Sequence, residues 1–554
     1  MEALSSTPMH RLPPEVLIRI FGMVYAEWDM ADHDANYEGA PDHMEVSHVC
    51  QRWRKAALDT QELWSRWPRY ETVDDGWTLL CCSRATTAPL YLNWKVGWTG
   101  DDDDAEEFYH SRIRHILPYA ARAQYLSIDV GIDYGSDERM GPKTFWHAEV
   151  LPALSTPFSL LQVFRIEMEF DDFNDDFTLC LDKTLFDGHS PPALRSVFLS
   201  CCEAKSNTPL FSSNLSKLEI HHARAWTNVD DMIRVFQSIP NLESLIYRFD
   251  YESSSRHLYD ATPSQHYPLR AVPMNRLKSF TLIDCRIVAG ITVFCYLALP
   301  FDTDIHIQCT YDVMADMSED ELTQAYRCMR MGADALQQHF ASALRSGYDP
   351  YAAVEIDDSS VSPISFMDDA SNGGRPLPRT LCWYTPFAPM RGLSQHSREI
   401  LAQSEPCVLI ALQPVFLQAT YLHLNGSYAD KWNTLWAKLH LYDKVAELHL
   451  SYKTVRYFAT YLDSREYRVE RLPALFPFLE IMTLSHFNFR GAKTIDDEGR
   501  ALVDVLGAAV CRTYGTSESF QRIYVGASCK GQRDTIERLR VHLGEQRVAG
   551  DSKV

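Results

Sequence analysis

A short phrase, apolar-x-x-apolar-x-apolar, recurs along the chain and constrains its fold more than any other feature. Six clear copies begin at Leu161, Leu194, Leu215, Leu242, Leu277 and Leu479, and less regular copies begin at Ala123, Ala419, Val445 and Phe520. Between Leu161 and Leu277 neighbouring copies start 33, 21, 27 and 35 residues apart. The phrase predicts a short strand with a buried row of side chains. Because no such unit is stable alone, the strands must lie beside one another and be covered.

The flanks of the phrase strengthen this prediction, since three apolar positions alone match by chance on the order of ten times in a chain of ordinary composition. Pro or Asn stands near the first apolar residue in "PPALRSV" and "SIPNLESL", and a helix-like stretch, "VDDMIRVFQSI" (229–239), precedes the copy at Leu242. "APLYLNW" (88–94) is the first strand expected. Helix and strand alternating at steps of roughly twenty to forty residues resemble degenerate leucine-rich repeats. The alternative is a non-repetitive α/β domain with similar strands.

The repeats are interrupted between about residues 312 and 380. "SEDELTQAYRCMRMGADALQQHFASALRSG" (318–347) predicts one long helix, because Ser318 and Glu321 form a capping box and Gly347 suits its C-terminal end. Residues 355–379 have the composition of a loop or a disordered segment.

The first seventy residues predict two short amphipathic helices. Pro13 and Pro14 suit the start of the first helix, where a missing N–H costs nothing, and Glu15 lies near its positive end. Its apolar face consists of Val16, Leu17, Ile20, Phe21 and Val24, and that of the second helix of Val46, Val49, Cys50, Trp53, Ala57 and Leu58. Two helices of this size cannot bury such faces against each other alone, so either the following domain or another protein must cover them.

The two segments resemble an F-box. That family's pattern is Leu-Pro-x-Glu-x-Leu, then Ile-Phe, then Val-Cys-x-x-Trp-Arg and a late Leu-Trp, and it is met by "LPPEVLIRIF" (12–21) and "VSHVCQRWRKAALDTQELW" (46–64). The linking stretch at 26–43 is longer than usual and resembles the extended form of many fungal F-box-like proteins. The longer linking stretch puts the middle of the expected contact with a partner in doubt more than the two ends of that contact. We therefore predict an F-box over 8–70, with an insert at about 26–45.

The resemblance implies a partner and a function. The helices would bind a Skp-type adaptor, which connects to a cullin scaffold in an SCF ubiquitin ligase, and the repeats would bind an unknown protein target. The chain would be a non-catalytic substrate receptor with an α+β fold: a small N-terminal all-α F-box, then an irregular leucine-rich-repeat-like α/β solenoid over 71–554. The implied adaptor-binding residues are Leu12, Pro13, Glu15, Leu17, Ile20, Phe21, Val49, Cys50, Trp53 and Arg54. Alternatively, the chain is a repeat scaffold whose N-terminal helices cap the solenoid.

Composition disfavours other classes of protein. The formal charge of −21 argues against nucleic-acid binding, which needs a basic surface. The N-terminus lacks the features of a signal peptide, and the apolar stretch at 287–301 is too short to span a bilayer. The 14 cysteines include no C-x2-C pair and are expected to be reduced, mostly buried thiols in a protein of the cytosol or nucleus.

No cofactor, metal or catalytic site is expected. The sequence contains no P-loop, G-x-G-x-x-G, G-x-S-x-G or H-E-x-x-H motif. Asp172, Asn174 and Asp176 have the spacing of calcium ligands, but Phe177 and Lys183 stand where a glycine and a glutamate are needed. An enzyme hidden in an irregular fold is the third hypothesis, and a deep pocket with converging polar groups would support it.

Overall fold

The computed structural model describes most of the chain in segments. These are residues 12–26, 47–66, 75–96, 110–111, 113–131, 144–169, 179–249, 259–285, 287–309, 319–345, 348–349, 351–356, 360–363, 375–376, 381–384, 412, 414–426, 436, 439–440, 442–464, 475–492 and 500–551. They form two compact units, unit 1 (Met1–Leu242 with Ser253–Tyr259) and unit 2 (Glu243–Glu252 with Asp260–Val554).

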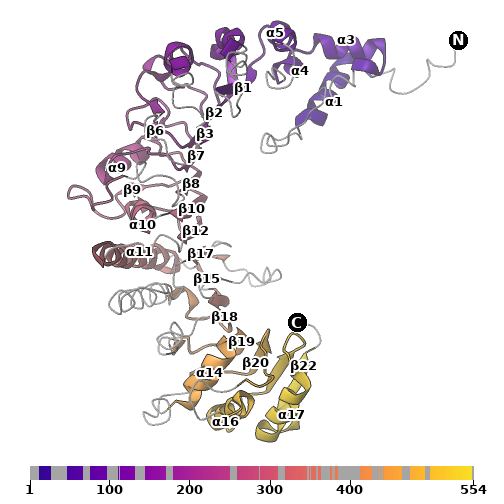
Figure 1. Ribbon diagram of the computed structural model, residues 1–554, viewed down its shortest axis with the longest axis vertical. Helices are drawn as coiled ribbons and strands as arrows, with labels where there is room; N and C mark the ends of the chain where they lie inside the picture. Colours follow the sequence, from indigo (N-terminus) through magenta and orange to yellow (C-terminus); the bar gives the residue numbers. More distant parts are fainter. Residues whose placement is uncertain are drawn as a thin grey trace, which may run out of the picture. The chain divides into compact units, whose positions relative to one another are not determined.

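Unit 1 begins with the helices α1 (Pro14–Ala26), α3 (Gln51–Asp59), α4 (Gln61–Ser65) and α5 (Asp75–Arg84) (Figure 1). Helix α1 packs on α3 and α4, and α4 packs on α5. The predicted insert at about 26–45 lies, beyond Ala26, outside the described residues. The predicted boundary at residue 70 falls inside unit 1, in which these helices and the first strands form one compact body.

A parallel sheet follows in unit 1. Its strands are, in spatial order, β1 (Leu90–Val96), β2 (Ala123–Gly131), β3 (Val163–Glu169), β5 (Ser196–Ser200) and β7 (Lys217–His221). The connections contain η3 (Leu117–Arg122), η4 (Trp146–Val150), α8 (Leu151–Leu154), η5 (Leu185–Gly188), α9 (Val229–Ser238) and a small parallel pair, β4 (Cys180–Leu181) with β6 (Glu203–Ala204). Such a connection after each strand is what parallel pairing requires.

Unit 2 contains a longer sheet. Its strands are, in spatial order, β8 (Ser244–Arg248), β10 (Ser279–Cys285), β12 (Asp304–Cys309), β17 (Leu381–Tyr384), β15 (Ser360–Pro363), β14 (Ala353–Ile356), β18 (Tyr421–Gly426), β19 (Glu447–Tyr452), β20 (Ile481–Ser485), β21 (Arg522–Gly526) and β22 (Val548–Asp551). Strand β15 runs antiparallel to β14 and β17, whereas the other described strand pairs in this sheet are parallel. Two small pairs, β9 (Val272–Pro273) with β11 (Leu297–Ala298) and β13 (Tyr348–Asp349) with β16 (Arg375–Pro376), flank it.

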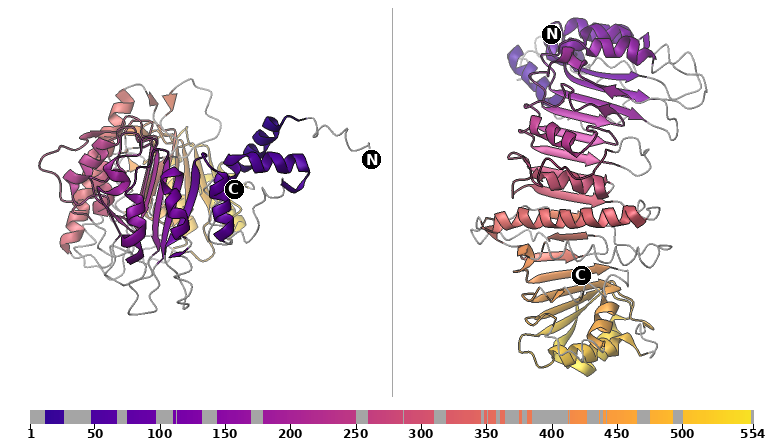
Figure 2. Two further views of the ribbon diagram at one scale, coloured as in Figure 1. Left: turned by 90° about the horizontal axis from the view of Figure 1, so that it is seen from above. Right: turned by 90° about the vertical axis from the view of Figure 1, so that its left-hand side faces the viewer.

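Helices cover one face of the unit 2 sheet. They are α10 (Ile287–Tyr296), α11 (Glu319–Arg345), α14 (Thr454–Asp463), α16 (Leu502–Tyr514) and α17 (Gln532–Leu543), with η8 (Glu545–Arg547) after them. Figure 2 shows α10 and α11 on the same side of the strands, and α14 packs on β18 and β19. Leu422, Leu448, Met482 and Ile523 alternate along their strands with half-buried or exposed residues. The helix-covered face therefore carries the core, and the opposite face of β18–β21 is polar.

The recurring phrase predicts the strands correctly. A strand begins two residues after the first apolar position in nine of the ten copies, for example at Ser196 after Leu194, and at Ala123 itself in the tenth. In the copy at Leu194, the three apolar residues Leu194, Val197 and Leu199 are fully buried. Burial of this row against the covering helices is what fixes the strand register.

Two expectations for the interrupted region have different outcomes. The helix predicted over 318–347 extends over Glu319–Arg345 as α11. Residues 355–379 were expected to be a loop or a disordered segment, yet residues 355–356 end β14, and Ser360–Pro363 and Arg375–Pro376 form β15 and β16, so this expectation is wrong for those residues. Pairing with β14 and β17 outweighs the weak strand propensity of "SVSP". No helix within the described residues is both long and apolar enough to cross a membrane.

Candidate functional site

Helix α1 carries two apolar stripes that have different environments. Leu17 and Phe21, one turn apart, are 0% and 1% exposed. The Phe21 ring packs on Trp53 of α3, with 5.3 Å between ring centroids. On another side of the helix, Val16 and Met23 are 40% and 65% exposed. One stripe therefore holds the helices together, while the other faces solvent.

Local hydrogen bonds explain how this helix pair is held. The carbonyl of Pro13 accepts from the N–H groups of Val16 and Leu17, at 3.1 and 3.2 Å, and so starts α1. Arg52 of α3 donates to the carbonyl of Leu12, which ties the start of α1 to α3. These bonds fix how α1 crosses α3, and they leave Val16 and Met23 of α1 exposed.

The ten predicted adaptor-binding residues differ in how far the structure buries them. Pro13, Glu15, Val49 and Arg54 are exposed, and Leu12, Ile20, Cys50 and Trp53 are half-buried. Leu17 and Phe21 are buried within the chain, so they support the surface and do not form it in this structure. Binding of an adaptor by these residues stays a prediction.

Sequence reasoning missed Met23 as a member of this surface. Val16, Ile20 and Met23 recur at positions i, i+4 and i+7, which places them on one helix face. The signal was therefore present, but the neighbouring Leu17 and Phe21 have the same spacing, and spacing alone cannot say which of two adjacent stripes is covered. We call Val16, Ile20 and Met23 the outer stripe.

Helix α4 fastens the helix pair to the first strand. The side-chain oxygen of Gln61 accepts from the backbone N–H and the hydroxyl of Thr87, both at 2.9 Å, and from the N–H of Ala88 at 3.2 Å. The Trp64 indole donates to a carbonyl of α3, and the Arg84 guanidinium lies 4.2 Å from the centre of its ring. These contacts orient the outer stripe relative to β1.

Burial makes several of the described cysteines unreactive. None of them forms a disulfide, and most are buried. Burial raises the pKa of Cys81 to about 12 and that of Cys82 and Cys201 to about 11, so these thiols stay protonated at neutral pH. Within the described residues, no group of three or more His, Cys, Asp or Glu side chains could hold a metal ion.

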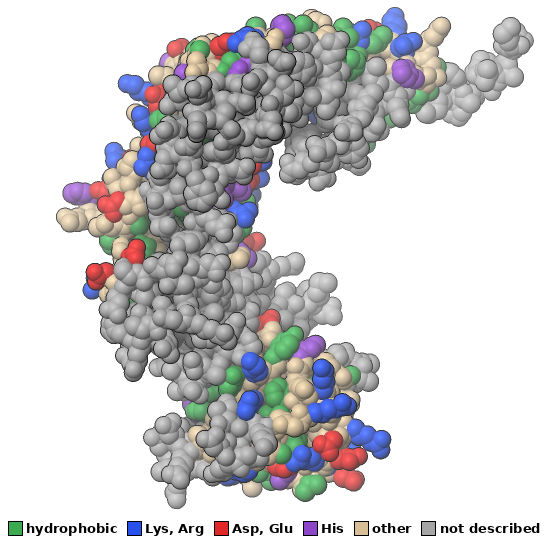
Figure 3. Space-filling model, viewed as in Figure 1, with side chains coloured by type: hydrophobic (Ala, Val, Ile, Leu, Met, Phe, Trp, Pro, Cys, Tyr) green, Lys and Arg blue, Asp and Glu red, His purple; other side chains and the backbone are tan. Residues whose placement is uncertain are grey.

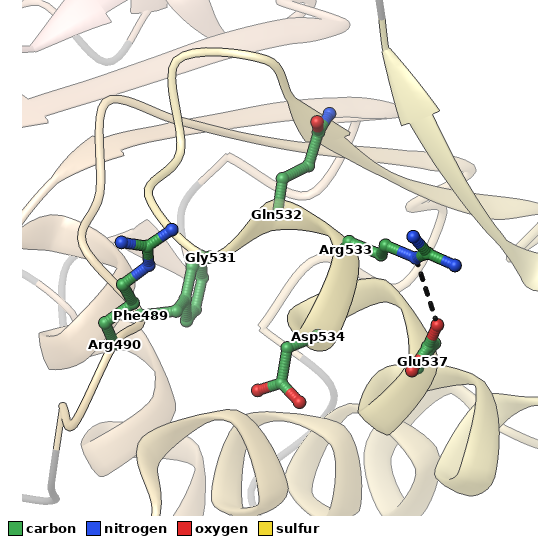
Figure 4. A pocket seen from close by; sticks show the side chains of 7 residues that line it. All are labelled: Phe489, Arg490, Gly531, Gln532, Arg533, Asp534 and Glu537. Carbon is green, nitrogen blue, oxygen red and sulfur yellow. Dashed lines mark ion pairs between the residues drawn. The ribbon is translucent and has the colours of Figure 1, made fainter.

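An open cavity of about 670 Å³ lies beside the N-terminal end of α17 in unit 2. Figure 4 shows Arg490 from the loop after β20 and Gln532, Arg533, Asp534 and Glu537 from α17 around it, with Phe489 and Gly531 completing the lining. Arg533 forms an ion pair with Glu537 at 3.5 Å. Positive and negative side chains are also intermixed over the C-terminal part of the face in Figure 3. The cavity pairs opposite charges and does not bring a nucleophile and a base together.

Comparison with known proteins now identifies the N-terminal helices. No curated protein matches the chain. The family model named F-box-like matches residues 9–67, a range that contains α1, α3 and α4. The outer stripe and the helix pair that supports it therefore belong to an F-box-like domain.

Proposed function

We propose that the chain is the substrate-recognition subunit of an SCF-type ubiquitin ligase in the cytosol or nucleus. An F-box-like domain is typical of subunits that bind a Skp-type adaptor and, through it, a cullin scaffold. Such a subunit is typically non-catalytic: it holds a target near the ubiquitin-charged enzyme and raises the effective concentration of the reacting groups. The observation that carries the proposal is the solvent-exposed outer stripe of α1 inside the matched domain.

The outer stripe has the chemistry of a docking helix. Apolar side chains at positions i, i+4 and i+7 are the anchors with which an amphipathic helix fills a partner's groove. Met23 is 65% exposed, and Val49, just before α3, is 60% exposed. Exposed apolar side chains gathered on one small domain mark an interaction surface more often than scattered ones do. Leu12, Pro13, Glu15, Cys50, Trp53 and Arg54 would extend this contact.

The rest of the chain would be the target-binding part, built as a leucine-rich-repeat-like solenoid. Two copies of the phrase, at Leu194–Cys202 and at Leu277–Cys285, follow the longer form L-x-x-L-x-L-x-x-C except that Val197 and Phe280 replace its second leucine. Cys202 is fully buried, as a position inside a stack of repeats should be. In four copies the residue seven positions after the first apolar one adopts a left-handed conformation, with φ between 50° and 52°: Cys201, His222, Tyr452 and His486. This recurrence of sequence and backbone together favours repeats over a non-repetitive α/β domain.

A repeat scaffold capped by its own N-terminal helices is the second candidate. Burial of Leu17 and Phe21, together with the bonds from Gln61 to the start of β1, supports it, since a cap must fasten to the first strand. An F-box subunit needs the same fastening, because it must hold the target in a fixed direction from the adaptor. The outer stripe distinguishes the two, since a cap that binds nothing gains no stability from exposed apolar side chains.

The experiment compares the wild-type chain with the double variant Val16→Ser/Met23→Ser. Both positions are exposed, so the variant should keep its fold. The matched control is Val541→Ser, which removes a valine that is 83% exposed on α17. We expect calorimetric titration with a purified Skp-type adaptor to show binding that the double variant weakens at least tenfold and the control leaves unchanged. Equal affinity of the double variant and the wild type would contradict docking through the outer stripe.

A further inference from the structure

The face of the unit 2 sheet opposite α14 carries a connected row of polar side chains. Glu355 of β14 pairs in register with His423 of β18, which pairs with His449 of β19. Two residues further along β19, Ser451 faces Ser485 of β20. These residues alternate with buried apolar residues of their strands, so their side chains lie on the face opposite α14.

Short polar contacts join these side chains into one continuous row with Tyr421. Glu355 Oε1 lies 3.1 Å from His423 Nδ1, and His423 Nε2 lies 2.9 Å from Ser451 Oγ. Ser451 Oγ lies 2.7 Å from Ser485 Oγ, which lies 2.7 Å from His449 Nε2. His449 Nδ1 lies 3.2 Å from the hydroxyl of Tyr421. The path crosses from β14 to β20 and returns to β18.

The direction of these bonds follows from the carboxylate at one end. The hydrogen bond from His423 holds the pKa of Glu355 below its ordinary value, so this group is ionised and can only accept. His423 Nδ1 therefore donates, and in a neutral imidazole Nε2 must then accept from Ser451. Ser451 accepts from Ser485, and Ser485 accepts from His449 Nε2. His449 Nδ1 then accepts from Tyr421, and each donor has one acceptor.

One added proton reverses this direction. When His423 is protonated, both of its ring nitrogens donate, and Nε2 gives its hydrogen bond to Ser451. Among the hydrogen bonds of this row, the acceptor then left for the Ser451 hydroxyl is Ser485, and the acceptor left for Ser485 is His449 Nε2. His449, which is half-buried, then loses its Nε2 proton to solvent and takes up one from solvent at Nδ1, from which it donates to the Tyr421 oxygen. The Tyr421 hydroxyl keeps its proton and turns it toward another acceptor.

We propose that Glu355, His423, Ser451, Ser485, His449 and Tyr421 form a proton-coupled hydrogen-bond relay that makes this face of unit 2 responsive to pH. Uptake of one proton at His423 switches His449 between its two neutral tautomers. It also changes the hydrogen bond of Tyr421: the hydroxyl no longer donates to His449 Nδ1 and can donate to a group that contacts this face. The relay is independent of the adaptor function, because nothing in it involves the F-box-like domain.

The charges around the relay oppose a second proton. The titratable groups around His423 are Glu355 from β14, Tyr421 from its own strand, and Glu447 and His449 from β19. The His423 and His449 rings are stacked with 4.4 Å between their centroids. Two imidazolium charges at this separation repel each other, so a second proton on the pair of rings is disfavoured.

The same residues do not form a catalytic triad, because a substrate cannot reach the serine. Glu355, His423 and Ser451 have the order of an acid–histidine–serine triad, but Ser451 is 2% exposed and is also hydrogen-bonded to Ser485, which is fully buried. A substrate carbonyl could not reach the Ser451 hydroxyl. These residues can therefore reverse the direction of their hydrogen bonds together, but Ser451 cannot act as a nucleophile.

The test follows histidine tautomers in the full chain, labelled with ¹⁵N only at histidine ring nitrogens. Long-range ¹H–¹⁵N spectra report which ring nitrogen carries a proton, and His423→Gln and His449→Gln assign the two rings. Between pH 8 and pH 5, where histidine changes charge, we expect His423 to become an imidazolium. Over the same interval His449 should remain neutral and move its proton from Nε2 to Nδ1.

Breaking the relay should separate protonation of His423 from the tautomer change of His449. In Ser451→Ala, and independently in Ser485→Ala, His423 should still take up its proton while His449 keeps its tautomer. Thermal unfolding checks that each variant is folded. The proposal is overturned if His449 keeps one tautomer in the wild type, if both rings become charged together, or if the serine variants behave as the wild type does. The wild-type measurement decides the matter even if a variant fails to fold.

Discussion

Acidification should loosen α11 through one buried histidine. His339 is 2% exposed, and its Nδ1 lies 3.4 Å from a guanidinium nitrogen of Arg270. Burial, and then the charge of Arg270, lower the pKa of His339 from 6.5 to about 3. His339 is therefore neutral in the folded protein at pH 5, whereas the unfolded chain is mostly protonated there.

The magnitude follows from proton linkage. The pKa of this group is lower in the folded state than in the unfolded state, so the unfolded state binds more protons below pH 6.5. Stability is present above pH 6.5 and is lost as the pH falls toward 3. The loss is about 1.4 kcal/mol per pH unit, so at pH 5 it amounts to about 2 kcal/mol.

Hydrogen exchange of α11 peptides measures this loss directly. After correction for the intrinsic pH dependence of exchange, protection of Glu319–Arg345 should fall about 30-fold between pH 7 and pH 5, which is the equivalent of about 2 kcal/mol. In His339→Gln, whose amide oxygen can accept from Arg270 but does not titrate, the fall should disappear. The matched control is His147→Gln, which replaces an exposed histidine. Equal loss of protection in the wild type and His339→Gln would refute the reasoning.

Three further predictions concern unit 1. Asn228→Ala should destabilise α9 by about 1 kcal/mol, measured as a lower midpoint of thermal unfolding, because the Asn228 side chain caps the helix by accepting from the Asp231 N–H at 2.9 Å. Gln61→Ala should lower the protection of the first strand's start by about 1–2 kcal/mol in hydrogen exchange, since it deletes three hydrogen bonds there. Cys81 and Cys82 should react with iodoacetamide at pH 8 at least about 100-fold more slowly in the folded chain than in urea, because their thiols stay protonated. Alkylation at the unfolded rate would contradict their burial.

The strands could be predicted from sequence because burial of a row of side chains imposes its own pattern. Leu215, Leu218 and Ile220 are all fully buried, and their spacing alone places β7. The left-handed residues that follow four strands carried no such signal, since they are Cys, His and Tyr rather than the Gly or Asn typical of that conformation. Strand β15 was missed because its pairing partners, and not its own residues, stabilise it.

The candidate sites also differ in how far the sequence alone could predict them. The outer stripe lies within one helix, so its spacing was visible in the sequence, although its exposure was not. His339 was missed because the sequence of a helix does not show which of its polar residues is buried, whereas in the structure His339 is 2% exposed. The relay could not be predicted, because its members extend from Glu355 to Ser485 and meet only through the register of four strands.

The most direct test of the central proposal is whether the full-length chain forms a complex with a Skp-type adaptor. The purified proteins are mixed at micromolar concentration and passed over a size-exclusion column with light-scattering detection. The account predicts one peak with the mass of a one-to-one complex. Separate elution of a well-folded chain and the adaptor would contradict it, and the N-terminal helices would then be a cap for the strands that follow.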